Sequence, residues 1–282
     1  MHTLTHRVTT RTTALLAVLV AAAGLALFGT SNAVAVNPAG AHPAGAHPAA
    51  GQKPTIVLVH GAFADGGSWN PVIERLHRRG FTAVAVANPL RGVHSDAAAL
   101  DARLAGIDGP VVLVGHSYGG AVITNVKARS PQVKALVYVA AFAPAEGEAA
   151  ARLAGQYPGS TLGETLAPVL LPDGSKDLHI KPSLFRQQFA ADVPARQAAL
   201  MASTQRPIRD VALDEASGEP AWSGIPSWFL LAGADKNIPL RAQKFMADRA
   251  GSRATVTVER ASHAVAVSRP DTVVELIVRA AG

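Results

Sequence analysis

The sequence predicts an α/β fold in which about six parallel strands are flanked by helices, with a mainly helical cap inserted after the fourth strand. Three observations support this prediction. From Thr55 onward, short aliphatic runs alternate with amphipathic helical stretches. The alternation stops over residues 144–222 and resumes at Pro226. Finally, 49% of the 282 residues are hydrophobic, which is enough for a substantial core.

The elements of the α/β unit follow from their composition and spacing. Runs of aliphatic or β-branched residues predict strands at residues 55–60, 82–87, 111–115, 133–141, 226–233 and 254–260. Amphipathic spacing predicts helices at residues 68–80, 95–107, 121–129, 239–250 and 269–280, with Ser95 as the N-cap of the second. Strands that alternate with helices in this way form a parallel sheet.

The stretch over residues 144–222 is rich in Pro, Gly and Ala and far exceeds an ordinary connection, which favours a functional role such as a lid. Helices are expected there around residues 182–190 and 194–203. Several apolar side chains of this cap could line a pocket or pack the cap onto the sheet: Tyr157, Leu162, Leu166, Leu170, Leu171, Phe185, Phe189, Met201 and Trp222.

The N-terminus has the pattern of a secretory signal peptide, assigned to residues 1–35. Arg7 and Arg11 precede an apolar run over residues 14–28, and small residues allow cleavage after Ala33 or Ala35. The run is shorter than the roughly 20 residues of a spanning helix, so secretion is expected. An uncleaved membrane anchor is the alternative. Residues 36–54 form a flexible Ala/Gly/Pro/His leader, and residues 55–282 form the α/β domain.

Charge and cysteine content exclude several classes of function. The net charge is +6 without any cluster of Lys or Arg, so no nucleic-acid partner is expected. There are no cysteines, which excludes a thiolate nucleophile and cysteine-based metal sites. No phosphate-binding loop is present. The sequence therefore predicts no metal or other cofactor, and no stable membrane association once the signal peptide is removed.

A serine stands at a sharp turn between a predicted strand and a predicted helix. Gly115-His116-Ser117-Tyr118-Gly119 fits the pattern G-x-S-x-G, directly after a buried strand. The glycines remove side chains that would collide with the neighbouring strand and helix, so that the hydroxyl projects above the sheet. Ser117 is therefore predicted to be a nucleophile.

A serine needs a general base, and the base needs an orienting carboxylate. His263 follows the last predicted strand, at the sheet edge where ligands bind in such folds. Asp235 follows the preceding strand at the same edge. The order Ser117, Asp235, His263 is that of an α/β-hydrolase triad.

Acyl transfer also needs donors for the developing oxyanion. The backbone N–H groups of Ala62, after the first strand, and of Tyr118, after the nucleophile, are the natural pair. Gly61 would let the first loop approach the serine. His60 is expected to brace this loop rather than to react.

Five segments together resemble the α/β-hydrolase superfamily: VLVHGAFADGGSW, GHSYGG, VAAFAP, GADKNIP and SHAVAVSRP. The likeness covers residues 55–280 and lies near the plant methylesterase and hydroxynitrile lyase branch and its bacterial esterase relatives. It implies the Ser117/Asp235/His263 triad, the Ala62/Tyr118 oxyanion hole, and a capped pocket for esters of small or aromatic acids. Four aromatic residues are assigned to this pocket: Phe63, Phe142, Phe185 and Trp222.

The lyases of that branch carry a lysine after the catalytic histidine and a threonine before the oxyanion residue. This chain has Ala264 and Gly61 there, so the lyase reaction is not expected. Dehalogenase chemistry is excluded because it needs a carboxylate at Ser117. The sequence predicts a secreted serine hydrolase that cleaves small-molecule carboxylic esters through an acyl-enzyme. A cofactor-free perhydrolase on the same triad, or a non-catalytic ligand-binding homologue, remains open.

Overall fold

The computed structural model describes residues 52–127 and 132–282. The predicted signal peptide and most of the predicted leader lie outside the described residues. So does the end of the helix that the sequence predicts over residues 121–129. None of the helices within the described ranges is long and apolar enough to cross a membrane.

Six parallel strands form the central sheet, in the order β2-β1-β3-β4-β8-β9. This confirms the predicted α/β fold. The centre of the sheet is inaccessible to solvent because helices cover both faces, so its strands read as continuous aliphatic runs. The strands are β1 (Thr55–Val59), β2 (Ala83–Val86), β3 (Val111–His116), β4 (Val133–Val139), β8 (Ser227–Ala232) and β9 (Ala254–Val258).

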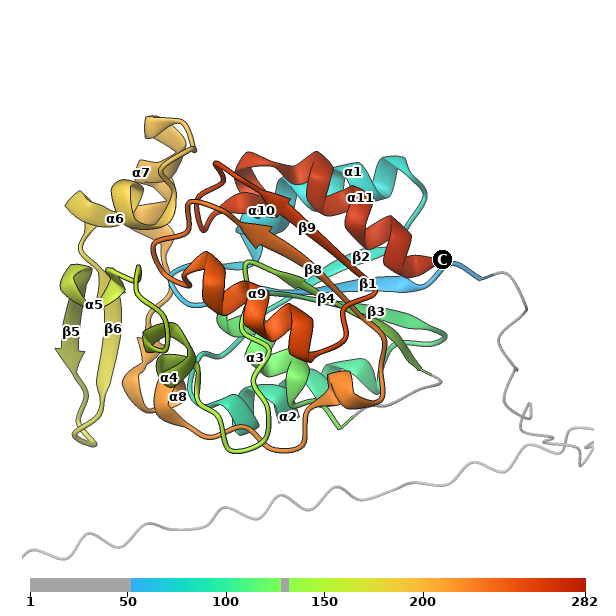
Figure 1. The fold of residues 1–282 in the computed structure, drawn as a ribbon, viewed down its shortest axis with the longest axis horizontal. Coiled ribbons are helices and arrows are strands. Elements are labelled where there is room, and N and C mark those ends of the chain that lie inside the picture. Colours follow the sequence, from blue (N-terminus) through green and yellow to red (C-terminus); the bar gives the residue numbers. More distant parts are fainter. Residues whose placement is uncertain (1–51, 128–131) are drawn as a thin grey trace, which may run out of the picture. The chain divides into compact units, whose positions relative to one another are not determined.

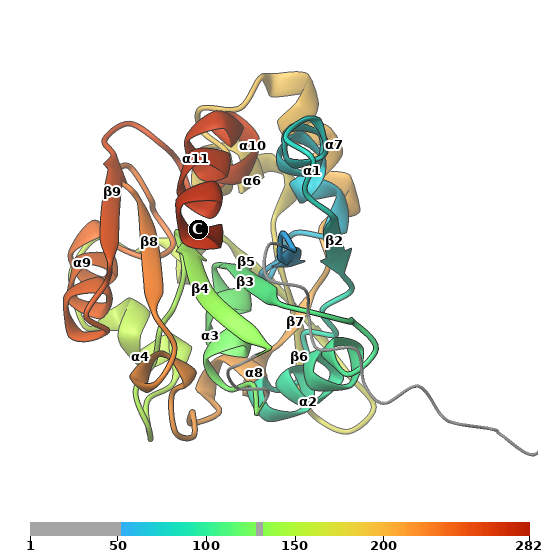
Figure 2. The same cartoon turned by 90° about the vertical axis from the view of Figure 1, so that its right-hand side faces the viewer.

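Helices from the two ends of the domain cover one face of the sheet, and helices from its middle cover the other (Figures 1 and 2). The first face carries α1 (Asn70–Arg78), α10 (Val265–Ser268) and α11 (Pro270–Ala281). The second carries α2 (Val93–Leu104), α3 (Tyr118–Thr124) and α9 (Leu240–Arg249). A 3-10 turn, η1 (Gly66–Trp69), leads into α1.

Ser95 is not the N-cap of α2, which corrects the sequence prediction. The helix begins two residues earlier with Gly92 as its N-cap, and the Ser95 hydroxyl donates to the Gly92 carbonyl at 3.0 Å. The carboxylate of Asp96 accepts the backbone N–H of Arg91 and thereby fixes the preceding turn. This contact, rather than a serine cap, sets the start of the helix.

The cap lies between β4 and β8, as predicted, and combines helices with a small sheet (Figure 1). The predicted cap helices are α6 (Pro182–Phe189) and α7 (Ala195–Thr204), each within a residue or two of its expected bounds. A three-stranded antiparallel sheet in the order β5-β6-β7 was not predicted. The remaining elements are α4 (Ala150–Gly155), α5 (Leu162–Thr165), β5 (Leu166–Leu170), β6 (Lys176–Ile180), β7 (Ile208–Arg209), α8 (Asp210–Asp214) and η2 (Ala221–Ser223).

Candidate active site

Ser117 occupies a strained turn between β3 and α3. Its φ is 53° and its ψ is −124°, a conformation that L-residues adopt only where the surroundings impose it. The end of β4 supplies that constraint, because Ser117 N donates to Val139 O at 3.3 Å and Phe142 N donates to Ser117 O at 3.1 Å. A Cβ atom at Gly115 would lie 2.6 Å from the carbonyl oxygen of Gly119. The predicted need for glycine at this turn is therefore confirmed.

His263 and Asp235 meet at the carboxyl ends of β9 and β8. Nδ1 of the histidine lies 2.7 Å from Oδ2 of the aspartate, and both side chains are buried. Three further donors approach this carboxylate: Asn237 N at 2.7 Å, Ile238 N at 3.1 Å and Gln243 Nε2 at 3.2 Å. Because a carboxylate only accepts, Nδ1 carries the proton and Nε2 presents its lone pair. The ring is thus oriented as a base.

Ser117 and His263 line the same cavity, which has a volume of about 370 Å³. Among the described residues, no hydrogen bond joins the Ser117 hydroxyl to His263, so the contact between nucleophile and base stays a prediction. No cluster of three or more His, Asp or Glu side chains suited to a metal ion occurs among residues 52–127 and 132–282.

The loop after β1 also lies close to Ser117. A Cβ atom at Gly61 would lie 2.6 Å from Ser117 Cβ, so only glycine permits this approach. Ala62 and Tyr118, the two predicted oxyanion donors, both line the cavity. As the first residue of α3, Tyr118 has no intrahelical acceptor for its N–H. The role of these two N–H groups as oxyanion donors stays a prediction.

His60 braces this loop, as the sequence predicts. Its Nε2 accepts the backbone N–H of Asn88 at 3.1 Å, so the proton is on Nδ1, which lies 2.9 Å from Gly61 O. The Asn88 side chain also donates to His60 O at 2.9 Å. Burial lowers the pKa of His60, which keeps the ring neutral in this role.

His116 forms a hydrogen bond with the backbone of His263, a contact that the sequence does not predict. Its Nε2 donates to His263 O at 2.9 Å, and the two ring centroids are 4.7 Å apart. Burial lowers the pKa of His116 to about 3, and the neighbouring His263 and His60 act in the same direction. The neutral ring is therefore a fixed hydrogen-bond donor to the backbone that carries His263.

The alpha/beta hydrolase family model matches residues 56–276, which is most of the chain. The chain belongs to the alpha/beta hydrolase family. Among its relatives is an alpha/beta hydrolase of Aspergillus novofumigatus, 28% identical over an alignment of 256 residues that covers 82% of this chain and 97% of the relative. The rice esterase PIR7B is 24% identical over an alignment of 258 residues, which covers 81% of this chain and 96% of the esterase.

The solved structure of a methylesterase from Arabidopsis superposes on this alpha/beta hydrolase with a TM-score of 0.66 at 18% identity. The match covers 80% of this chain and 98% of the methylesterase. At this identity the likeness establishes the fold. Together with the relatives, it confirms the expected resemblance to the methylesterase branch.

Two of the four aromatic residues assigned to the pocket of this hydrolase line the cavity, namely Phe63 and Phe142. The other two do not, which corrects the prediction. Phe185 stacks on Phe189 in the cap core with ring centroids 5.1 Å apart. Trp222 donates from Nε1 to Pro144 O at 3.1 Å. The cavity is lined instead by small and aliphatic cap residues that include Ala150, Ala151, Ala154, Leu162, Leu166 and Leu213.

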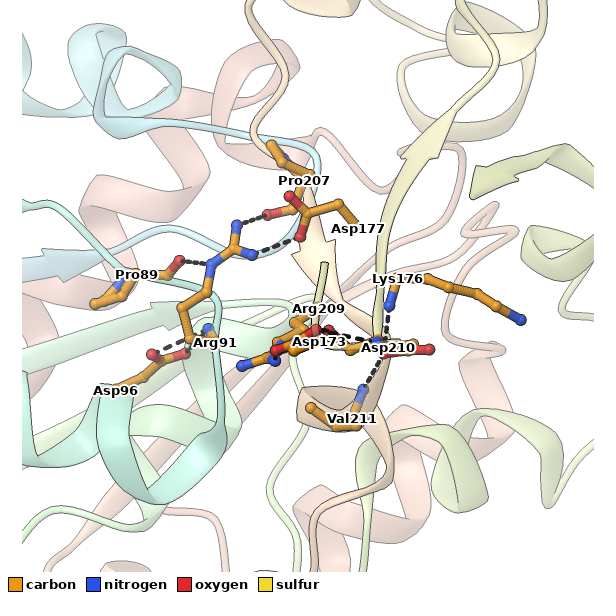
Figure 3. Close-up of polar contacts among 11 residues, drawn as sticks. Pro89, Arg91, Asp96, Asp173, Lys176, Asp177, Pro207, Arg209, Asp210 and Val211 are labelled. Carbon is orange, nitrogen blue, oxygen red and sulfur yellow. Dashed lines mark hydrogen bonds and ion pairs between the residues drawn. The ribbon is translucent and has the colours of Figure 1, made fainter. Parts of the chain in front are cut away.

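Arg91 ties the cap of the hydrolase to its sheet domain (Figure 3). Its Nη1 lies 2.5 Å from the Asp177 carboxylate on β6, and Nη2 donates to Pro207 O at 3.4 Å. Its backbone N–H donates to Asp96 at 3.1 Å. The Tyr118 hydroxyl donates to the same carboxylate at 2.9 Å, so one continuous polar chain joins the cap to the residue after the nucleophile.

This chain of contacts is buried at its inner end. Burial raises the pKa of Asp96, although the hydrogen bonds from Arg91 and Tyr118 oppose that shift. Burial, together with the nearby Asp96 carboxylate, raises the pKa of Tyr118. The phenol therefore stays protonated and continues to donate.

Proposed function

We propose that this chain is a secreted serine esterase that cleaves carboxylic esters through an acyl-enzyme on Ser117. The observation that supports it most strongly is that His263, hydrogen-bonded to Asp235, lines the same apolar cavity as the strained Ser117. Esterases among its relatives support ester cleavage as the reaction class. Secretion is proposed from the N-terminal sequence alone.

In the first half-reaction, His263 Nε2 takes the hydroxyl proton while Ser117 Oγ attacks the ester carbonyl. The negative charge that develops on the carbonyl oxygen is stabilised by the N–H groups of Ala62 and Tyr118. The imidazolium, held by Asp235, then protonates the leaving alcohol. This leaves an acyl group on Ser117.

In the second half-reaction, water replaces the alcohol. His263 takes a proton from the water, which attacks the acyl carbon, and the proton passes to Ser117 Oγ as the acid leaves. Asp235 remains ionised throughout, because its part is to hold the Nδ1 proton and to stabilise the imidazolium. Carboxylic acid and alcohol are released in equal amounts.

The first experiment compares three forms of residues 36–282 on p-nitrophenyl acetate and butyrate: the parent, Ser117→Ala and Ser160→Ala. Ser160 is the matched control because it lines the same cavity without a place in the proposed reaction. We expect hydrolysis by the parent and by Ser160→Ala, and a loss of several orders of magnitude for Ser117→Ala. Equal rates for Ser117→Ala and the parent would refute the nucleophile.

A fluorophosphonate probe gives a second readout that does not depend on the choice of ester. It should label the parent at Ser117, as mapped by peptide mass spectrometry, and should not label Ser117→Ala. A folded parent that neither reacts with the probe nor hydrolyses any ester would favour the ligand-binding alternative. Formation of peracid when hydrogen peroxide is added, at a rate above hydrolysis, would favour the perhydrolase.

A further inference from the structure

The loop that carries His263 is held by the cap as well as by the sheet domain. Ala264 N donates to Phe189 O at 3.0 Å. The Ser262 hydroxyl donates to the carboxylate of Asp192. Phe189 ends α6, and Asp192 follows it in the same cap segment. The residues directly before and after His263 are therefore both bonded to this short segment of the cap.

The side chain of His263 packs against two other rings. Its centroid lies 4.7 Å from that of His116 and 4.9 Å from that of Phe189. The Phe189 ring is nearly perpendicular to the imidazole, with an interplanar angle of 76°. Phe189 is 1% exposed and is not among the residues that line the cavity. It therefore contacts the proposed base from the cap without forming part of the cavity wall.

This packing matters because the hydrogen bond to Asp235 does not fix the imidazole alone. A histidine side chain has two torsions, and the second has a broad energy well. The contact of Nδ1 with Asp235 therefore leaves the ring partly free to tilt. A tilt moves Nε2, the atom that takes the serine proton in the proposed reaction. The rings of Phe189 and His116 limit this motion.

The cap segment that makes these contacts is itself packed on two sides. Phe185 stacks on Phe189 within the cap, with ring centroids 5.1 Å apart. From the sheet domain, Phe63 meets the same ring edge-on at 6.5 Å. Arg269 Nη1 lies 3.5 Å from Oδ2 of Asp192, so one carboxylate oxygen is paired while the other accepts the serine hydroxyl. A neighbouring side chain is thus held against a well-packed wall.

We propose that Phe189 positions His263, so that the cap orients the base of the reaction in addition to lining the cavity. The inference rests on the proposed esterase function and adds a positioning residue to it. Phe189 acts only by limiting the tilt of the imidazole. Because the orientation of the base matters when the proton is transferred, its loss should lower kcat and kcat/KM equally and leave KM unchanged.

The first test compares Phe189→Leu with Phe229→Leu on p-nitrophenyl butyrate. Leucine keeps the site apolar and removes the ring. Phe229, in β8, is the matched control because it is also 1% exposed and its ring stacks on Tyr138, with centroids 4.5 Å apart. We expect Phe189→Leu to lower kcat about tenfold with little change in KM. Phe229→Leu should keep the parental kcat and KM.

The proton on Nδ1 of His263 gives a second readout that needs no substrate. It lies in the hydrogen bond to Asp235 and is expected as a separate low-field signal in the proton NMR spectrum, assigned by its loss in His263→Ala. Phe189→Leu should shift or broaden this signal, whereas Phe229→Leu should leave it unchanged. A residue that only stabilises the cap would not act on it.

Ser262→Ala tests the same cap segment without changing a ring. It removes the donor to Asp192, and the resulting loss of kcat should again come without a change in KM. Ser227→Ala is its control, because Ser227 is 2% exposed like Ser262 and donates instead to Ala250 O. This second pair of variants decides the question if Phe189→Leu does not fold.

Parental kcat together with an unchanged Nδ1 signal in Phe189→Leu and Ser262→Ala would overturn the inference. So would an equal loss of kcat in Phe229→Leu, since a general loosening of the core would then be responsible. A parent that hydrolyses no ester would overturn the proposed function instead. The Nδ1 signal would still show in that case whether the cap orients His263.

Discussion

The buried His116 makes the stability of the fold depend on pH, in a way that one substitution isolates. Burial lowers its pKa to about 3, whereas an unfolded chain has a histidine pKa near 6.5. Between these two values the unfolded state binds a proton that the folded state does not. The free energy of unfolding therefore rises with pH across this window and falls as the solution is acidified.

The size of the effect follows from the difference between the two pKa values. At pH 7.5 the unfolded histidine is almost entirely neutral, so the contribution vanishes. At pH 5, about 1.5 units below the histidine pKa of the unfolded chain, proton binding stabilises the unfolded state by about 2 kcal/mol. His60 has a lowered pKa as well and acts in the same direction. Only the part of the pH dependence of stability that is lost when His116 is replaced can be assigned to His116.

His116→Gln is the appropriate change, because the glutamine amide can donate to His263 O and does not titrate. Urea unfolding of the parent and the variant, at pH 7.5 and at pH 5, gives four free energies of unfolding. We expect acidification to destabilise the parent by about 2 kcal/mol more than the variant. An equal loss in both proteins would show that His116 is not held neutral, and the reasoning from its burial would be wrong.

Two further predictions concern the cap anchor and the orienting acid. In a double-mutant cycle with Arg91→Met and Asp177→Asn, measured by urea unfolding, we expect a coupling energy of about 0.5–1 kcal/mol. The more exposed pair Arg78 and Glu74 on α1 should give a smaller coupling energy. Equal coupling energies in the two cycles would contradict the role of Arg91 in holding the cap. Asp235→Asn should lower kcat on p-nitrophenyl acetate by about 10⁴-fold because the amide favours the wrong imidazole tautomer. A loss below tenfold in a folded variant would argue against the assignment of Asp235.

The sequence predicts the parts of the fold that depend on local pattern. The four central strands are mainly aliphatic runs buried by helices on both sides, so each is recognisable without its neighbours, and the half-buried edge strands β2 and β9 are recognisable from their β-branched and aliphatic residues. The turn at Ser117 is recognisable from its G-x-S-x-G pattern, in which Gly115 avoids a collision with the nearby Gly119, whereas Gly119 makes room for the distant Val59. The sequence also predicts that Ser117, Asp235 and His263 lie at one edge of the sheet, because each comes after the C-terminal end of a strand.

The cap sheet could not be predicted because its pairing is not local. Strand β7 has only two residues, and about thirty residues of chain separate it from β6, the strand with which it pairs. Pro168 within β5 also argues against a strand when read alone. The directions of Phe185 and Trp222 depend on how the cap packs, which periodicity does not reveal. The sequence carries no signal for the contact of Phe189 with His263, because the two residues meet only when the cap packs on the sheet domain.

Because the cap is one continuous segment of the chain, the residues proposed to react and many of the residues that line the cavity are encoded by different parts of the sequence. Every residue proposed to take part in bond making lies outside residues 144–222, whereas much of the cavity wall lies inside them. A foreign cap could therefore be grafted into this segment to alter substrate choice. Several contacts between the cap and the sheet domain would have to survive the exchange, among them the bond from Phe63 N to Arg206 O, the ion pair of Arg91 with Asp177 and the bond from Ala264 N to Phe189 O. A transplant that restores these contacts would keep the first loop in place against the serine, so the cap of this hydrolase could be replaced to change selectivity.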